Sequence, residues 1–332
     1  MNRRNQILAG ILILQLLVVA VVLWPRPVTS GGEDQSLFPD VKADRIVGLT
    51  ITSAAGQTIQ LAKRPGGWVL PDADDYPCQE DKVAPILAKI AGLKADRVVA
   101  QTSSSYKRLM VGEEHFERRI EFELDDGTHH WLYLGTSPSF HAAHIRADDQ
   151  DEVYLISDLS SQDAGVEATA WVDRIYFSVP QDQVVTLTLE NKNGRFEFVK
   201  DSDSWALKGL TGGETLNTDV VQSLINRATS VALLRPLGKE EKDAYGLKEP
   251  SAVISIQTHS DETGDRTCTL RVGAQDTTDK SYIIASSESP YYVRVTEFTV
   301  RDWVGKARDD FLELPPSPTP MPEASPEATP GS

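Results

Sequence analysis

Histidines are concentrated in one short stretch of the chain. Residues 125–146 hold four of the six histidines. Imidazole nitrogens are common zinc ligands, and a zinc site takes three or four ligands with a satisfied second shell. If the loop after the first histidine pair folds the chain back, His141 or His144 could approach His130, beside an acid from residues 148–151. The pattern therefore suggests the hypothesis that His130, His144 and His141 bind a metal ion.

Other chemistry-bearing motifs are missing from the sequence. There is no Gly-x-Ser-x-Gly elbow, no His-Glu-x-x-His pair and no phosphate-binding Gly-x-x-x-x-Gly-Lys loop. The acidic stretch 71–81 lacks the ligand order of a calcium loop. The two cysteines, Cys78 and Cys268, give no framework for disulfides. We therefore expect no catalytic residues and no cofactor.

Composition and charge exclude one class of partner. The chain has 332 residues, enough for two ordinary domains, and a formal net charge of −16. Beyond Arg3 and Arg4 it contains no basic run. Binding to nucleic acid requires clustered cations that neutralise phosphates, so we expect no nucleic-acid partner.

The N-terminus predicts attachment to a membrane. Residues 7–24 carry no charge and would span roughly 27 Å as a helix, which is close to the thickness of a bilayer core. Arg3 and Arg4 favour a cytoplasmic N-terminus, and Trp24 lies where an interfacial aromatic is expected. We expect a retained single-pass anchor in the cytoplasmic membrane, with the bulk of the chain outside it. Cleavage after Ser30 is the alternative.

The elements that would position these residues occur twice. In order along the chain, Asp44, Val47, Leu49, Thr50 and Gly56 recur as Asp182, Val185, Leu187, Thr188 and Gly194. Further along, Trp68, Leu70, Val83 and Leu87 recur as Trp205, Leu207, Val220 and Leu224, and Leu132 and Gly135 recur as Leu270 and Gly273. An order-preserving series of this kind predicts two homologous units.

Each unit is predicted to be a mainly antiparallel sheet with one principal helix, an α+β class. A hairpin begins each unit, and amphipathic helices are expected at 79–93 and 217–231. Alternation predicts the remaining strands at 117–124, 129–134, 143–147 and 152–156, and again at 251–258, 267–272, 281–285 and 291–296. A short helix is expected near the closing tryptophan of each unit.

Comparison of the two units bears on the aromatic residues and the histidines. Trp68 matches Trp205, and a pair kept in both units is expected to anchor the core, with a sugar-stacking platform as the alternative. The second unit has Arg266 and Thr267 where the first has its histidine pair. The histidines are therefore expected to be dispensable to the scaffold, either exposed on a hairpin rim or forming an acquired metal or pH-sensitive site.

The second unit carries a recognisable motif. Tyr245, Gly246, Leu247 and Pro250 form a turn that is followed by a strand ending in Gly273. Together with the closing Arg-Asp segment, the motif resembles a bacterial family catalogued as domain of unknown function 4340, over roughly residues 40–314. The resemblance implies an N-terminal anchor, tandem copies and, in some relatives, association with ABC-type transporters. It implies no catalytic residues.

The turn also has a physical explanation. Gly246 would supply a positive φ or a close approach, and Pro250 would begin an extended strand without needing an N–H. We expect Tyr245 and Leu247 to pack the sheet against the helix. In the first unit, residues 106–115 replace the motif, although Gly135 keeps the strand-end glycine.

The predicted organisation follows. It comprises a cytoplasmic N-terminus (1–6), an anchor (7–24), a linker (25–43), a first repeat (44–180), a second repeat (181–314) and a disordered Pro-rich tail (315–332). The expected function is a non-catalytic interaction or scaffold protein whose partner is a transporter or envelope component. A binding module for a cell-wall glycan or small ligand is the alternative, and a metal-dependent hydrolase is a third class.

Overall fold

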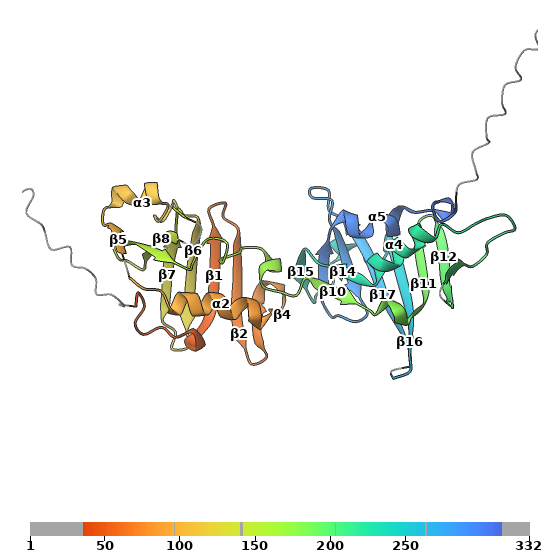
Figure 1. Cartoon of the computed structure of the whole chain (residues 1–332), viewed down its shortest axis with the longest axis horizontal. Helices are drawn as coiled ribbons and strands as arrows, with labels where there is room; N and C mark the ends of the chain where they lie inside the picture. Colours follow the sequence, from red (N-terminus) through yellow and green to blue (C-terminus); the bar gives the residue numbers. More distant parts are fainter. Residues whose placement is uncertain (1–35, 96, 140–141, 203, 263, 314–332) are drawn as a thin grey trace, which may run out of the picture. The chain divides into compact units, whose positions relative to one another are not determined.

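The computed structural model describes residues 36–95, 97–139, 142–202, 204–262 and 264–313, and it has the expected α+β class (Figure 1). The chain forms two compact units. The first comprises the residues up to Val69 and Cys78–Trp171, and the second comprises Leu70–Pro77 and the residues from Val172 onward. The predicted anchor 7–24 and the tail 315–332 lie outside the described residues. Within the described ranges, no helix is long and apolar enough to cross a membrane.

The first sheet is antiparallel and has the strand order β4-β3-β2-β1-β6-β7-β8-β9-β5. Its strands are β1 (Ile46–Ser53), β2 (Thr58–Arg64), β3 (Gly67–Leu70), β4 (Tyr76–Pro77), β5 (Arg97–Ala100), β6 (Arg118–Leu124), β7 (His129–Leu134), β8 (Ala142–Ala147) and β9 (Val153–Ser157). Its helices are α2 (Glu80–Ala91) and α3 (Ser103–Leu109).

The second sheet has the order β13-β12-β11-β16-β17-β18-β19-β15. Its strands are β11 (Val184–Asn191), β12 (Gly194–Asp201), β13 (Ser204–Leu207), β15 (Arg235–Gly238), β16 (Ala252–Ser260), β17 (Gly264–Gln275), β18 (Tyr282–Ser286) and β19 (Tyr292–Val295). The helices are α4 (Thr218–Ala228) and α5 (Glu297–Gly305), and β10 (Ile175–Ser178) pairs with β14 (Ser230–Ala232). From β3 and β13 onward, the two strand orders agree position by position.

The central strands explain why alternation predicted them well. In β1, Leu49 and Ile51 are fully buried, and they lie opposite Leu61 and Ile59 of β2. Alternate residues of a strand face opposite sides, so these side chains form one apolar face. Near its start, β1 has an irregularity in its pairing with β6. There Ile46 is buried and Val47 is half-buried, so the alternation that continues at Leu49 is interrupted.

Each principal helix covers the apolar face of its sheet. Helix α2 buries Val83, Ile86, Leu87 and Ile90, and α4 buries Val221, Leu224, Ile225 and Ala228. The side chain of Asn217 accepts a hydrogen bond from the Val220 N–H (3.2 Å), as an N-cap residue does. The amphipathic pattern therefore predicted both helices correctly.

The tryptophans were expected to be buried in the core, and each unit was expected to end in a short helix. The structure agrees with these predictions only in part. Trp68, Trp171 and Trp303 are buried, but Trp205 is only half-buried. Strand β3 is flanked by β4, whereas β13 is the last strand of its sheet, and an edge strand leaves its side chains more accessible. Near Trp171 the expected short helix is one 3-10 turn, Ala168–Ala170.

The turn motif packs on the opposite face from the one expected. Tyr245 and Leu247 form a cluster with Ile283 and Ala285, and this cluster contains no residue of α4. The adjacent Ile284 is also fully buried and faces the other side of β18. The prediction that the motif packs the sheet against the helix is therefore wrong: the turn covers the second face of the sheet.

A glycine makes this cover possible in both units: Gly135 directly follows β7, and Gly273 lies inside β17, two residues before its end. A Cβ built on Gly273 would lie 2.0 Å from the carbonyl oxygen of Tyr245, and one on Gly135 would lie 2.1 Å from that of Leu109. Leu109 ends α3, whose segment replaces the turn motif in the first unit. Any side chain at either glycine would push the covering turn off the sheet.

We predict that Gly273→Ala destabilises the protein by about 3 kcal/mol, because the methyl group overlaps a backbone oxygen that cannot move independently. Urea unfolding followed by circular dichroism measures the effect. Gly66→Ala is the control, since a Cβ there meets nothing within 4 Å. Equal stability of the two variants would contradict the proposed close packing.

Candidate functional site

The predicted metal ligands lie far apart in the first sheet. Strands β7 and β8 are antiparallel, with Leu134 opposite Ile145. The Gly135 N–H donates to the His144 carbonyl (2.8 Å), so His144 lies beside Gly135, at the other end of β7 from His130. That separation is roughly 16 Å along the strand. One ion cannot contact both imidazoles, so the structure does not bring His130 and His144 together.

His130 is part of the packing and not a rim residue. Its ring stacks on Phe122 and meets the edge of Phe38, with centroid distances of 5.3 Å in both cases. Its Nδ1 lies 2.9 Å from Oδ2 of Asp148, whose other oxygen accepts the Trp131 N–H at 2.9 Å. The histidine and the carboxylate therefore join the end of β8 to the start of β7, and the ring covers two buried phenylalanines.

His144 has a different set of partners. Its Nδ1 lies 2.9 Å from Oγ1 and 2.8 Å from the carbonyl oxygen of Thr136. His129 is exposed, and His141 lies outside the described residues. Among the residues that the structure describes, no three His, Cys, Asp or Glu side chains are grouped as metal ligands. A metal site remains a prediction only for sets that include His141.

Both cysteines are free thiols. Burial raises the pKa of Cys78 to about 12 and also raises the pKa of Cys268, to which Glu288 contributes. Only the thiolate is a nucleophile, so these environments suppress reactivity at neutral pH. The two residues fit structural roles and not covalent catalysis.

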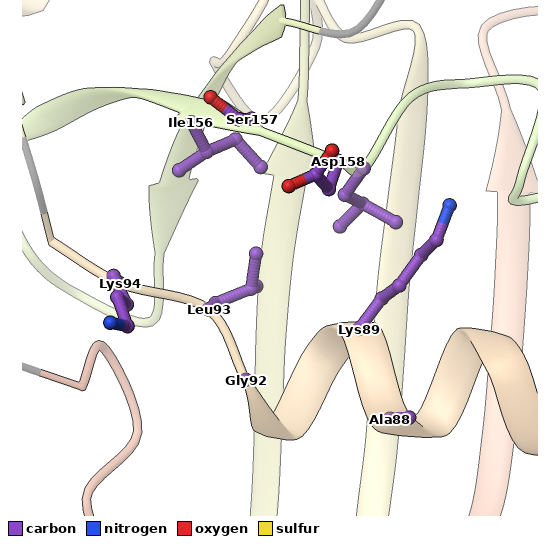
Figure 2. Close-up of a pocket in the computed structure, with 9 residues that line it drawn as sticks. Ala88, Lys89, Gly92, Leu93, Lys94, Ile156, Ser157 and Asp158 are labelled. Atoms are coloured by element: carbon purple, nitrogen blue, oxygen red, sulfur yellow. The ribbon is translucent and has the colours of Figure 1, made fainter.

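A cavity of about 510 Å³ in the first unit is one candidate site (Figure 2). It lies between the C-terminal end of α2 and the end of β9. Figure 2 shows Leu93 and Ile156 directed toward each other across it, with Lys89 rising along one side. The complete lining is Ala88, Lys89, Gly92, Leu93, Lys94, Ile156, Ser157, Asp158 and Leu159.

The polar side chains of this cavity come from both of its walls, and one of them is an aspartate that follows β9. Lys89 Nζ is paired with Oδ1 of Asp163 at 2.6 Å, so its charge is neutralised within the unit. Asp158 has a positive φ of 69°, which holds the backbone after β9 in a sharp bend. The titratable side chains of the lining are Lys89, Lys94 and Asp158, and it contains no histidine or cysteine.

The second unit has a matching ion pair. Arg227, in the last turn of α4, is paired with Asp302 of α5 at 2.7 Å, as Lys89 of α2 is with Asp163. The guanidinium also lies 4.4 Å from the ring centre of Phe298, which is 60% exposed. In each unit a cation near the end of the principal helix thus binds the segment that closes the unit.

The sequence did not reveal the cavity. Its two walls come from α2 and from the end of β9, which are separated by five other elements in the chain. Ile156 and Leu93 look like ordinary apolar positions of a strand and a helix end. The antiparallel pairing of β5 with β9 brings the segment after α2 next to β9.

We predict that His130→Ala lowers the free energy of unfolding by about 2 kcal/mol, since it removes a packed ring and leaves Asp148 without this partner. His129→Ala, at the exposed neighbouring position, should change stability by less than about 0.5 kcal/mol. Urea unfolding of the two variants checks this. A stable His130→Ala protein would restore the view that the ring lies on a rim.

We also predict that iodoacetamide alkylates neither cysteine in the folded protein at neutral pH, because both thiols stay protonated. Both should react once urea unfolds the chain. Mass spectrometry of the intact protein counts the adducts. Rapid labelling of folded protein would mean that one thiol is activated.

Comparison with known proteins gives one result. The family model "Domain of unknown function (DUF4340)" matches residues 68–250, a narrower range than the resemblance over 40–314. No curated protein and no solved structure matches the sequence. Because the matched range covers more than half of the 332 residues, the chain belongs to the DUF4340 family.

Proposed function

We propose that this protein is a single-pass, membrane-anchored interaction protein whose two units lie outside the cytoplasmic membrane. The anchor is residues 7–24, whose apolar length suits a bilayer core. The cations at Arg3 and Arg4 support an N-terminus on the cytoplasmic side. The acidic surface keeps the outer part soluble and repels anionic lipid heads.

The two units are two copies of one ancestral module. Three features support this: the matched strand orders, the recurring residues, and the close approach at both Gly135 and Gly273. The β-irregularities also correspond, since β1 has one between Ile46 and Gly48 and β11 has one between Val184 and Thr186. Bulges are conserved within protein families, so a bulge at the same place in both units supports a common origin.

One observation carries the interaction role. Strand β5 ends the first sheet and exposes two large apolar side chains, Val98 (41%) and Val99 (36%). Uncovered edge strands invite pairing with another chain, and proteins normally protect them. An edge of this kind in a protein without a catalytic motif favours contact with a protein partner. The proposal of a transporter or envelope component as that partner rests on the family resemblance alone.

A ligand-binding role is the second candidate, and the cavity between α2 and β9 favours it. Its volume of about 510 Å³ lies within the range of small-molecule sites. The lining mixes apolar and charged side chains and contains no aromatic ring. This suits a small amphiphile better than a glycan, because glycan sites usually offer an aromatic stacking surface.

Chemical crosslinking of the full chain in its native membrane, followed by mass spectrometry, tests the interaction role. We expect a reproducible envelope or transporter protein among the crosslinked neighbours. A chain lacking residues 7–24 should be released from the membrane and lose that neighbour. Absence of any reproducible neighbour, or retention of the truncated chain in the membrane, would contradict the proposal.

A further inference from the structure

The two sheets end in corresponding strands that differ in their cover. Strand β5 pairs with β9 and β15 pairs with β19, and each is the last strand of its sheet (Figure 1). In β5 the first three residues are exposed and the fourth is half-buried. In β15, Pro236 and Gly238 are buried. One edge is therefore protected and the other is not.

The cover of β15 is an acidic segment. Residues Leu70–Pro77 belong to the second unit and contain three aspartates. The carboxylate of Asp74 accepts the backbone N–H of Lys239 at 2.6 Å, directly after the strand. Gly238 has a φ of 98°, and a Cβ there would lie 2.4 Å from Oδ2 of Asp74. At the protected edge, an acidic segment thus accepts a hydrogen bond from the backbone N–H of a lysine that directly follows the strand.

Positively charged side chains lie around β5, and they suit an acidic segment like the one that covers β15. Arg97 in the strand, and Lys107 and Arg108 in the following helix α3, are all exposed. No carboxylate among the described residues forms an ion pair with any of these three. The nearby Glu152 is bonded to Gln101 instead, at 3.4 Å. Asp151 is also close to α3, where its carboxylate accepts a hydrogen bond from the hydroxyl of Tyr106 at 3.2 Å. Both nearby carboxylates thus have other partners, and the three cations are left to meet an incoming segment.

We propose that the free edge of β5 binds an extended, acidic polypeptide segment as an added strand. Main-chain hydrogen bonds to the edge would supply affinity. Val98 and Val99 would be covered by the added strand, and the three cations would select acidic side chains. This inference rests on the proposed interaction role and names the site and chemical class of the partner.

Peptide binding to the full-length protein in detergent tests the site. The probe is a short, capped peptide in which Glu alternates with Thr, and its counterparts carry Lys in place of Glu or N-methylated backbone amides. We expect only the unmodified acidic peptide to bind. Joint charge reversal of Arg97, Lys107 and Arg108 to Glu should weaken its binding at least about tenfold.

A matched variant separates local from general charge effects. Arg195→Glu alters one exposed cation on β12, which is not an edge strand, and is compared with Arg97→Glu, which changes the net charge equally. Arg195→Glu should leave peptide affinity unchanged, whereas Arg97→Glu should lower it. Equal binding of the N-methylated peptide would overturn strand addition. No binding of the acidic peptide, or no effect of the triple reversal, would overturn the site itself.

Site-specific photocrosslinking in cells separates this inference from the proposed function. A photoreactive residue at Val99 should capture the partner, whereas one at the equally exposed Val185 (36%) should not. If chemical crosslinking finds a partner that position 99 never captures, the interaction role is supported and the proposed binding site at β5 is contradicted. If neither method finds a neighbour, both proposals fall.

Discussion

The close approach of a carbonyl oxygen to a glycine of the sheet is the constraint on which each unit depends. Gly135 and Gly273 leave room for the oxygens of Leu109 and Tyr245. Because the turn can then lie flat on the sheet, the face away from the principal helix acquires an apolar cluster of its own. An antiparallel sheet with one helix layer would otherwise leave that second face to water.

In each unit an arginine donates a hydrogen bond to the turn that covers the second face of the sheet. The two arginines belong to strands that do not correspond. In the first unit, Arg146 of β8 is 8% exposed and donates to the Val111 carbonyl at 2.9 Å. Its guanidinium also lies between the rings of Tyr106 and Tyr133. In the second unit, Arg271 of β17 donates to the carbonyl of Leu247, the central residue of the turn motif, at 3.2 Å. The same task is thus met by arginines at positions that do not correspond, so the two covers differ in sequence while they agree in geometry.

Residues present in only one unit can still build that unit. His130 has no histidine counterpart in the second unit, yet its ring packs on Phe38 and Phe122. Comparison of the two units suggested that the histidines decorate the fold. The contacts of His130 argue against that prediction, because the cores of the two units can fill the same space with different side chains, provided that the volume is kept.

The sequence by itself determined the α+β class, the central strands and the two principal helices. Burial on one face imposes a period of 2 or 3.6 on neighbouring residues, and that pattern can be read locally. The tertiary structure alone decided which face the Tyr245 turn covers, that β5 is uncovered while β15 is protected, and that Leu93 and Ile156 share a cavity. Each of these depends on contacts between segments distant in the chain, and such contacts leave no periodic trace. The edge strands β5 and β15 were also missed. Strand β5 has no buried face to impose alternation, and the buried positions of β15 are Pro236 and Gly238, which are not typical strand residues.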